Sequence, residues 1–541
     1  MKSTQVHSHL ERRKRKLQVV AQSCHKITEY RREFPVENEA EMLREDVRTL
    51  RKQVRDLMES RATVTEVPKS NYVLLDLLVE TAARNSEKNR HGLRFDEKLK
   101  VVAAVIYLLA SLQAYVCLSR LLPFPSVDTA RSCLYDADRL LEGSLRFDEA
   151  MKFLDSRFLP RKVVCIEDAT RIQGIIQYDH KTNQIKGFML PCDDFGLPVP
   201  ESYPATSARK VADYFETKET SNYAYCVMAQ PLSPDCRPFC LLMHGTNQKF
   251  KAADIVKRWE RIETEALNYN VEVVGFSADG DPRLLKSMIY RVIRSSPLIE
   301  WPWFQSIKNS EEIYVQDHIH LGTKLKTRLC SPSIILPFGK DHFASRGHLL
   351  ELITNVSKDQ HSLTLSDIDS KDKMNFKSVQ KISNPVIPQL LISHVPSSEA
   401  TAAYLVMIND VLSAFMDTTL TPLERVEKIW DPAFFVRIWR KWLLGEDGYT
   451  AQSNFSSANT YACIELNAHG LIQFLVKCRD SGEPHLFLPW LISSQQCEST
   501  FRSLSSTGVT HCGVVNFSVL ELENRFRRIE FLEEAMLQLN Q

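Results

Sequence analysis

The chain lacks a surplus of charge of either sign. Its 541 residues include 68 lysines and arginines against 67 aspartates and glutamates, which leaves a formal net charge of +1. This balance excludes the strong positive field of a small nucleic-acid-binding protein, so any contact with DNA has to come from local patches. A hydrophobic fraction of 44% and a charged fraction of 25% are typical of an ordinary soluble globular protein. At this length we expect three or four folding units.

A membrane span and a disulfide framework are also lacking. The most apolar run, residues 101–116, falls short of the ~20 residues that a bilayer requires and includes Ser111 and Gln113. We therefore predict a buried core helix there. The 13 cysteines are odd in number and scattered, and the polar, basic N-terminus predicts no signal peptide. These features indicate a reducing compartment, the nucleus or the cytosol.

Positive charge gathers near the start of the chain, in a polar tail that we place at residues 1–34. The tail contains a run of five basic residues, Arg12, Arg13, Lys14, Arg15 and Lys16. Such a run is typical of a nuclear-import signal or a phosphate-binding patch, and equally of a solvated tail. We take these residues as candidate DNA-binding residues and expect a nuclear protein.

A hydrophobic stripe follows at residues 35–60. Its members alternate at spacings of four and three residues, and they are Val36, Ala40, Leu43, Val47, Leu50, Val54 and Leu57. This spacing predicts a short coiled coil and a homo-oligomer. An amphipathic helix packed on its own domain would give a similar stripe, so that alternative stays open. Residues 61–90 are polar and contain Pro68, which indicates a linker with one helix at about residues 72–83.

The middle of the chain changes from a helical pattern to a β pattern. Residues 95–141 predict two helices joined by a short turn at 123–126, with Ser126 as the N-cap of the second helix. From Lys162 onward, segments rich in Val, Ile, Tyr and Phe predict strands at 163–179, 184–190, 223–232 and 239–246. A helix at 252–267, a strand at 271–277 and a helix from Pro282 follow. The first strands should be antiparallel, and the next should join by a helical crossover.

Beyond residue 329 the pattern is mainly helical. We predict helices at 371–382, 399–416, 422–430, 432–444, 495–504 and 521–539. The fold class is therefore α/β plus all-α. The expected units are a helical region at 91–158, the first part of a mixed-sheet core at 159–330, a helical insertion at 331–480 and closing helices of the core at 481–541.

Two of the predicted strands end in carboxylates. The apolar run at 163–166 leads directly into Glu167 and Asp168, and the strand at 271–277 leads into Asp279 and Asp281. The centre of a sheet is buried on both faces, so acids there call for a positive partner. Carboxylates at strand ends could supply the hard oxygen ligands that two Mg²⁺ ions need for phosphodiester cleavage. Asp-Gly is also a common turn, so the acids alone leave a structural role open.

The segment DATRIQGIIQYD at 168–179 resembles the first-strand signature of P-element-type DNA transposases, including those with a THAP zinc finger. In that signature an Asp-Glu-Met opening is followed by Ile and then by an aromatic-Asp pair. Asp168, Ile172 and Asp179 occupy the matching positions, whereas Ala169 and Thr170 replace the Glu and the Met. The register favours the second acid of the Glu-Asp pair as the ligand.

Further blocks resemble the same family in the same order, over roughly residues 95–529. The blocks are AYVCLSRLLPFPSVDTARSCL at 114–134, YCVMAQPL at 225–232, NQKFKAADIVKRW at 247–259, VVGFSADGDPRLLKSM at 273–288, YVQDHIHLGTKLKTRL at 314–329, KMNFKSVQKIS at 373–383, TAAYLVMINDVLSAFMD at 401–417 and SSQQCESTFRSL at 493–504. The first looks like the family's helix-turn-helix segment. The last looks like its C-terminal helix, whose glutamate completes the active site.

The resemblance implies an RNase H-like mixed sheet with a large helical insertion, preceded by a helix-turn-helix DNA-binding region and a short coiled coil. It implies that Asp168, Asp279 and Glu498 hold Mg²⁺ or Mn²⁺, with Asp281 as a substitute for Asp279. The implied activity is hydrolysis of double-stranded DNA at transposon ends, followed by attack of the freed 3′-OH on target DNA.

Two departures from the family pattern bear on this activity. The N-terminal THAP zinc finger is lacking, since Cys24 and His25 are the only Cys-His pair before Cys117. A domesticated or inactive nuclear protein that binds DNA or a partner is therefore the alternative function. Some members of the family bind GTP in the helical insertion. We find no phosphate-cradling glycine loop there in a chain with 17 glycines, so GTP is an expectation from the resemblance only.

Two groups of residues in the block at 314–329 have competing interpretations. His318 and His320 have no second pair of zinc-like ligands nearby, which favours a structural or DNA-facing role over zinc. Lys324, Lys326 and Arg328 alternate with other residue types. They are candidate DNA-binding residues, and an ordinary solvated face is the alternative.

Overall fold

The computed structural model describes residues 45, 47–53, 73–86, 88, 92–110, 112–135, 140–234, 236–295, 312–506 and 517–540. They fall into two compact units. One unit holds the described residues up to Lys100 together with Val116–Pro125, and the other holds Val101–Tyr115 and the described residues from Ser126 onward. The basic run at 12–16 and most of the stripe at 35–60 lie outside the described residues. Residues 47–53 are helical, and Leu50 among them is 58% exposed.

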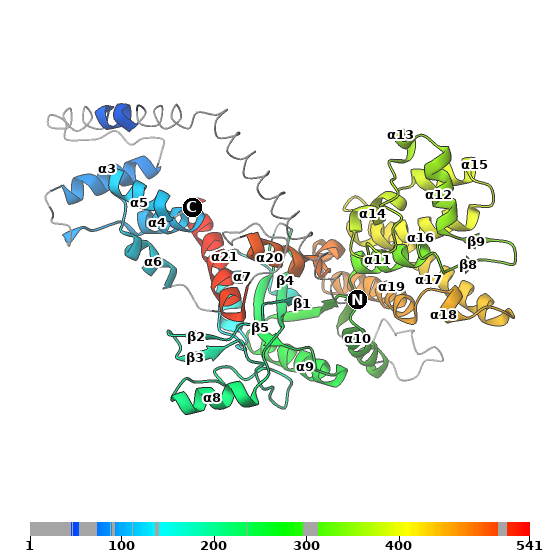
Figure 1. Cartoon of the computed structure of the whole chain (residues 1–541), viewed down its shortest axis with the longest axis horizontal. Helices are drawn as coiled ribbons and strands as arrows, with labels where there is room; N and C mark the ends of the chain where they lie inside the picture. The colour runs from blue at the N-terminus through cyan, green and yellow to red at the C-terminus, as the bar shows by residue number, and fades with distance from the viewer. Residues whose placement is uncertain are drawn as a thin grey trace, which may run out of the picture. The chain divides into compact units, whose positions relative to one another are not determined.

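The helices that precede the sheet are α3 (Val73–Asn85), α4 (Glu97–Leu109), α5 (Leu112–Leu121), α6 (Val127–Tyr135) and α7 (Phe147–Ser156) (Figure 1). α3 agrees with the helix predicted inside the linker. Ser126 is confirmed as an N-cap, because its Oγ accepts a hydrogen bond of 3.2 Å from the backbone N of Thr129 in α6. The two helices predicted over 95–141 are in fact three, because the apolar stretch is divided between α4 and α5.

This division corrects the prediction of one buried helix at 101–116. Ala103 and Ala104 of α4 are fully buried, but Leu109 and Leu112 on either side of the break are 73% and 50% exposed. The apolar composition of the run had concealed the break. Among the residues that the structure describes, no helix is long and apolar enough to cross a membrane.

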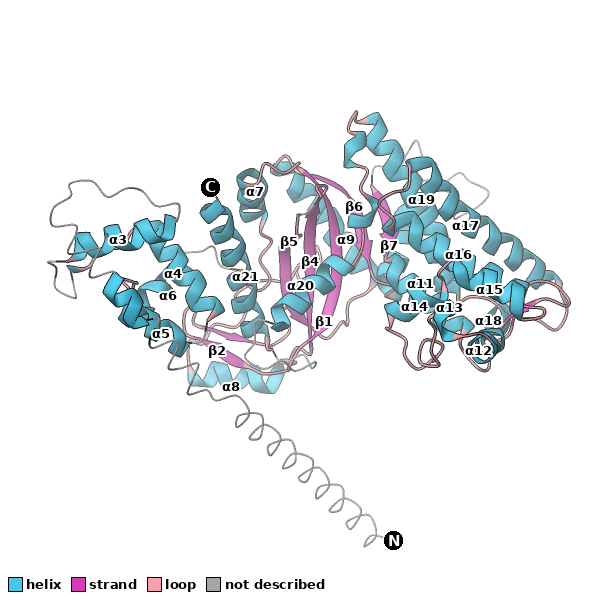
Figure 2. Cartoon of the chain, turned by 90° about the horizontal axis from the view of Figure 1, so that it is seen from above, coloured by secondary structure: helices cyan, strands magenta, loops and turns pink. Residues whose placement is uncertain are grey.

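A five-stranded mixed sheet lies at the centre of the second unit (Figure 2). Its strands, in spatial order, are β5 (Phe239–Thr246), β4 (Tyr223–Pro231), β1 (Lys162–Arg171), β6 (Glu272–Ala278) and β7 (Ile313–Gln316). β1, β4 and β5 are antiparallel, and β6 and β7 run parallel to β1. α9 (Ala252–Asn268) connects β5 to β6, and α10 (Pro282–Ser295) follows β6. The predicted antiparallel start and helical crossover are confirmed.

Helices cover this sheet with apolar faces. On α9 the buried residues recur every three or four positions and form one face of the helix: Ile255, Trp259, Ile262 and Ala266. Trp259 stacks on Phe276 of β6 with 4.6 Å between the ring centroids. α20 (Gln495–Ser506) contacts β1 and β4, and its buried residues show a similar spacing: Cys497, Phe501 and Leu504. α21 (Val519–Asn540) packs next to α20.

One predicted strand of the main sheet belongs elsewhere. Residues 184–190 contribute only β3 (Gln184–Lys186), which pairs with β2 (Gln177–Asp179) in a separate hairpin. This hairpin and α8 (Ala208–Thr217), which the sequence pattern did not reveal, share a small hydrophobic cluster of Ile185, Phe188, Leu190, Tyr203 and Tyr214. The apolar residues that suggested a sheet strand therefore belong to a local core.

The second half of the chain is mainly helical, as predicted. The elements are α11 (His318–Leu329), β8 (Leu336–Pro337), β9 (Phe343–Ala344), α12 (Arg346–Asn355), α13 (Lys358–His361), α14 (Phe376–Ile382), α15 (Val386–His394), α16 (Glu399–Met416), α17 (Pro422–Gly445), α18 (Ala451–Asn454) and α19 (Ala458–Asp480). α16 has the predicted bounds. The helices predicted at 422–430 and 432–444 form the single helix α17, in which Pro432 is buried. Packing in the core thus overrides the helix-breaking tendency of proline.

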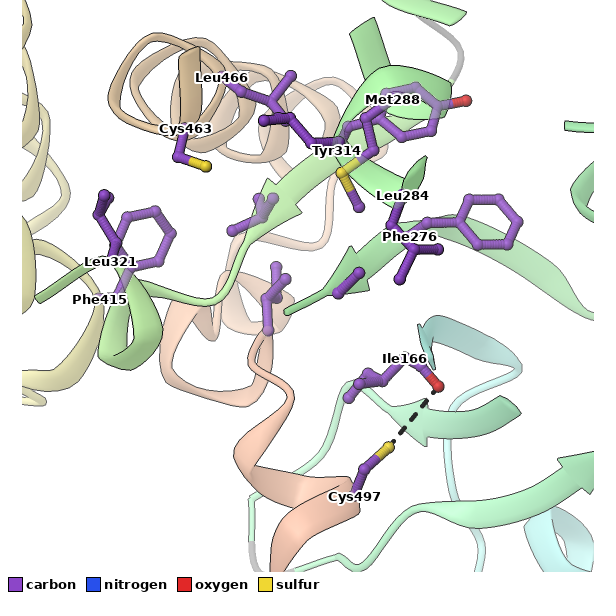
Figure 3. Close-up of a cluster of buried hydrophobic side chains, with 14 of the residues drawn as sticks. Ile166, Phe276, Leu284, Met288, Tyr314, Leu321, Phe415, Cys463, Leu466 and Cys497 are labelled. Atoms are coloured by element: carbon purple, nitrogen blue, oxygen red, sulfur yellow. Dashed lines mark hydrogen bonds between the residues drawn. The ribbon is translucent and has the colours of Figure 1, made fainter. Parts of the chain in front are cut away.

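One hydrophobic core joins the sheet to these helices. Figure 3 shows Phe276, Met288 and Tyr314 near Leu466 of α19, with Leu321 of α11 beside Phe415 of α16. Because the sheet and the helical insertion share a core, the insertion is packed against β7 rather than tethered by loops alone.

Both outer strands of the five-stranded sheet have partners beyond the sheet. At β7, the side chain of Asn467 in α19 accepts a hydrogen bond of 2.7 Å from the backbone N of Gln316 and donates one of 2.8 Å to its carbonyl O. At β5, the backbone N of Gly143 donates to Met243 O at 2.8 Å, and the segment before α7 continues this pairing. A side-chain amide at one edge and a backbone segment at the other satisfy groups that a neighbouring strand would otherwise bind.

Candidate active site

β1 and β6 bring two aspartates to the same region of the sheet. Asp168 lies inside β1, three residues before its end, and Asp279 directly follows β6. These strands are parallel neighbours in which Glu167 lies opposite Ala278. The next residue in each strand is an aspartate, Asp168 in β1 and Asp279 after β6. Residues in register on parallel strands point to the same face of the sheet. The Asp168 and Asp279 carboxylates therefore lie on the same face. The two aspartates thus lie on neighbouring strands, but only Asp279 lies at a strand end, because β1 continues beyond the acidic pair at which the sequence pattern predicted it to end.

Glu167 points to the other face of the sheet, because successive side chains in a strand alternate. Its carboxylate accepts hydrogen bonds from Arg258 of α9, at 3.4 Å from Nε and 3.3 Å from Nη2, and from the hydroxyl of Tyr225. All three residues are buried. The sequence predicted a positive partner for the acids of this strand. Arg258 is that partner for Glu167, but it does not pair with Asp168.

Asp168 is surrounded by other acids instead. Burial, and then the charges of Asp279 and Glu498, raise the pKa of the Asp168 carboxyl to about 8. The backbone N of Ala169 donates a hydrogen bond of 2.7 Å to Asp168 Oδ1 and opposes this shift. The pKa of Asp279 is also raised, chiefly by burial. Converging carboxylates whose pKa values rise through burial and mutual repulsion are typical of sites that bind a cation or a proton.

Asp281 has a structural role in this arrangement. Its Oδ1 accepts a hydrogen bond of 2.7 Å from the backbone N of Arg283 at the start of α10, and its Oδ2 forms an ion pair of 2.5 Å with the Arg283 guanidinium. These contacts with Arg283 lower the pKa of Asp281 despite its partial burial. Asp281 therefore caps a helix and pairs with Arg283, which argues against its serving in place of Asp279.

Glu498 reaches the same edge from α20. The residue before it, Cys497, holds α20 against β1. The Cys497 thiol lies 3.7 Å from the carbonyl O of Ile166 (Figure 3). Glu498 Oε1 lies 3.0 Å from Nε2 of His320. Burial disfavours charge on His320, but the hydrogen bond to Glu498 and the neighbouring acids raise its pKa to about 9. His320 is therefore an imidazolium that donates to Glu498 at neutral pH.

Asp317 fixes the positions of both partners in this pair. Its Oδ1 caps α11 by accepting from the backbone N of Ile319 and of His320, at 2.6 and 3.1 Å. Its Oδ2 accepts from the hydroxyls of Ser493, at 3.0 Å, and of Ser494, directly before α20. One buried carboxylate thus ties the helix that carries His320 to the helix that carries Glu498. The sequence pattern of the block at 314–329 did not reveal this link to the two serines.

His318, two residues before His320, lies away from the acids. Its ring stacks on Phe415 with 5.2 Å between centroids, and burial lowers its pKa. This agrees with a structural role. Within the described part of the chain, no group of three or more His, Cys, Asp or Glu side chains has an arrangement that could hold a metal ion. The acids at the sheet edge converge without forming a closed coordination site.

The three basic residues of α11 do not form one row of side chains on a DNA-facing surface. Lys326 is 1% exposed, and its Nζ donates to the carbonyls of Asp369 and Asp372 at 2.9 and 3.1 Å. The prediction that Lys326 contacts a phosphate is wrong for this arrangement, because the ammonium is buried on backbone oxygens. Arg328 donates to the carbonyls of Phe455 and Gln452, at 2.7 and 2.6 Å.

Lys324 is the basic residue of α11 that reaches the acidic edge. Its Nζ donates to the carbonyl O of Gly280 at 3.0 Å, and its positive charge partly opposes the rise in the pKa of Asp279. Arg12, Arg13, Lys14, Arg15 and Lys16 lie outside the described residues, so their role stays a prediction.

The architecture is a mixed sheet compatible with an RNase H-like core, together with a mainly helical second half of the chain. A solved structure described as the Drosophila P element transposase strand transfer complex matches this chain with a TM-score of 0.61. The match covers 86% of this chain and 98% of that one, at 14% sequence identity. The chain therefore has a P-element-transposase-like fold. No protein-family model and no curated protein matches the sequence.

Proposed function

We propose that this protein is a DNA transposase that cleaves and joins transposon ends by two-metal phosphodiester chemistry. The observation that most supports the proposal is the electrostatic influence of Asp279 and Glu498 on Asp168 near one edge of the sheet, in a chain with a P-element-transposase-like fold. The fold alone does not define a function. The acids supply the chemical argument.

No group of three or more side chains among the described residues is arranged to hold a metal ion, so a divalent cation would have to draw the acids together. Asp168 and Asp279 offer hard carboxylate oxygens on neighbouring strands, and their pKa values are raised chiefly by burial. Mg²⁺ or Mn²⁺ would supply positive charge beside these carboxylates, activating the attacking oxygen and stabilising the leaving one. Asp168 and Asp279 would hold the ions, and Glu498, positioned by His320, would complete the set and orient water.

The reaction has two steps. In the first, the oxygen of water bonds to phosphorus at the transposon end, the bond from phosphorus to the 3′-oxygen breaks, and that oxygen takes up a proton. In the second, the freed 3′-OH bonds to a phosphorus of target DNA, loses its proton to solvent and displaces a 3′-oxygen of the target. In both steps the phosphorus passes through a five-coordinate transition state, which would lie beside the carboxylates.

A strand-cleavage assay on the element's own terminal repeats, with Mg²⁺ or Mn²⁺, tests the proposal. We expect cleavage by the native chain and its loss in the double variant Asp168→Ala, Asp279→Ala. Glu216→Ala, at an exposed acid of α8, is the matched control and should cleave normally. Equal cleavage by the double variant would reject the assignment of the site.

A nuclear DNA-binding protein that no longer cuts is the second candidate. The observation that favours it is the engagement of Glu498 by His320, together with the lack of a metal-ready group of side chains among the described residues. Binding of the terminal repeats without cleavage under all metal conditions would support this candidate. Terminal inverted repeats in the DNA that flanks the gene would favour the enzyme.

The proposal extends to assembly and location. The stripe at 35–60 would join copies of the chain as a coiled coil, and the basic run at 12–16 would direct it to the nucleus and add DNA contacts. Light scattering on the full chain and on a variant that lacks residues 36–57 tests the first point. An unchanged number of subunits in the shortened variant would exclude the coiled coil as the oligomer interface. GTP binding stays an expectation from the family resemblance.

A further inference from the structure

Two cations on α11 face the acidic edge of the sheet. His320 and Lys324 are four residues apart in the helix, so they lie on the same face, one turn from each other. His320 pairs with Glu498, whereas the ammonium of Lys324 lies over the turn that follows β6. Lys324 Nζ donates to the carbonyl O of Gly280, the residue that directly follows Asp279. α11 therefore brings positive charge to the site at two points.

Gly280 gives Lys324 its place. A Cβ built at residue 280 would lie 1.6 Å from Lys324 Nζ and 2.7 Å from its Cε, far closer than atoms can approach. The backbone of Gly280 does not have the positive φ that favours glycine, in contrast to Gly143 or Gly187. Space for the lysine, rather than backbone freedom, is thus what glycine provides between Asp279 and Asp281.

The Lys324 ammonium keeps hydrogen-bonding capacity at this position. It has three N–H donors, and the hydrogen bond to Gly280 O uses one of them. Its side chain is only partly buried. By contrast, Lys326 is buried and its ammonium donates to two backbone carbonyls. Of the two lysines, Lys324 is therefore the one placed to meet an anion at the carboxylate edge.

We propose that Lys324 binds a backbone phosphate of DNA next to Asp279, and that Gly280 is required to admit its ammonium there. The proposal rests on the proposed function, because it takes DNA as the substrate at this edge. A phosphate that approaches Asp168 and Asp279 meets like charge. A half-buried lysine whose ammonium lies at the turn after Asp279 gives that phosphate a cationic contact, while cations bound by the acids would serve the reacting oxygens.

The test measures binding rather than cleavage. A fluorescent DNA duplex is titrated with the full chain at a series of salt concentrations, once with EDTA and once with Ca²⁺. Each phosphate contact adds about 0.9 to the slope of log affinity against log salt. We expect Lys324→Met to weaken binding and to lower this slope by about one unit. Lys324→Arg, which keeps the charge, should recover most of the slope.

Gly280→Ala separates a phosphate contact from a structural role of the lysine. It should lower the slope as Lys324→Met does, and the double variant should show no further decrease, because both changes remove the same contact. Lys371→Met, at an exposed lysine of the insertion, is the matched control and should leave the slope unchanged. Far-UV circular dichroism verifies that each variant is folded.

The outcomes distinguish this proposal from the proposed function. If the native chain binds DNA and Lys324→Met has an unchanged slope in both buffers, Lys324 makes no phosphate contact, and the transposase assignment stands. Additive losses for Lys324→Met and Gly280→Ala would also overturn the shared-contact argument. If the native chain binds no DNA at all, the proposed function itself fails.

Discussion

Glu167 and Asp168 are neighbours in β1, but their side chains lie on opposite faces of the sheet and have opposite electrostatic surroundings. On the α9 face, Glu167 is 0% exposed and meets Arg258 and the hydroxyl of Tyr225. On the α20 face, burial and the charges of Asp279 and Glu498 raise the pKa of Asp168 to about 8. A buried acid paired with its own arginine stabilises the fold. A half-buried acid near other acids has no such arginine, which is typical of a binding site.

Arg258→Met should break the α9 side of this comparison with the largest effect. It leaves the Glu167 carboxylate buried without a cation, and removal of one partner of a buried ion pair costs about 3–5 kcal/mol. Denaturant-induced unfolding of the full chain measures the loss. The double variant Glu167→Gln, Arg258→Met should be more stable than the single variant, since no buried charge remains. A single variant as stable as the native chain would contradict the structural role of the pair.

Asp168→Asn should have the opposite sign. Burial and the neighbouring acids raise the pKa of Asp168 to about 8 in the folded chain, whereas its ordinary pKa is about 4. Stability is therefore lost as the pH rises between these values, and asparagine removes that loss. In EDTA the variant should be more stable than the native chain at pH 8 and equal to it near pH 4. Thermal unfolding at several pH values would show a destabilised variant if the idea is wrong.

Mg²⁺ should act as the counter-ion of Asp168. Binding to the folded chain stabilises it by about 1.4 kcal/mol when the free ion is at ten times its Kd. We expect Mg²⁺ to raise the melting temperature of the native chain at pH 8 but not that of Asp168→Asn, Asp279→Asn. Arg258 and Glu167 lie on the other face, so Glu167→Gln, Arg258→Met should still respond to Mg²⁺. A response that survives in the Asp168, Asp279 variant would place the ion elsewhere.

Asp281→Ala is expected to have the smallest effect. This carboxylate caps α10 and pairs with Arg283, and loss of a cap costs about 1 kcal/mol. The variant should keep both cleavage and the response to Mg²⁺, whereas Asp279→Ala should lose them. Parallel cleavage and unfolding measurements on the two variants decide between the aspartates. Loss of cleavage in Asp281→Ala at unchanged stability would give Asp281 a part in the chemistry.

The sequence predicted the parts of this site that depend on local pattern. Apolar runs that lead into acid singled out Asp168 and Asp279, and the order of strands and helices predicted their strands in one sheet. The pattern did not reveal that β1 continues three residues beyond Asp168. Glu498 could be named only through the family resemblance, since a glutamate in the first turn of a helix is ordinary on its own. Its partner His320 lies 178 residues earlier, and no spacing rule links residues so far apart.

Errors in the predicted fold have physical causes of the same kind. The segment at 184–190 has the apolar content of a sheet strand, but its residues pack with Tyr203 and Tyr214 in a local cluster. Lys326 looks like a solvated cation by its alternation, yet the fold buries it on two carbonyls. In each case tertiary packing, which the pattern of one segment does not contain, decides the outcome.

The amide of Asn467 against β7 and the backbone of Gly143 against β5 have a consequence for how copies of this protein could meet. A sheet recruits a foreign strand through unpaired backbone groups on an outer strand. With a helix side chain on one flank and a chain segment on the other, those groups are already engaged. Association should therefore proceed through helical surfaces, and peptides that act by strand addition should find no foothold at these two positions.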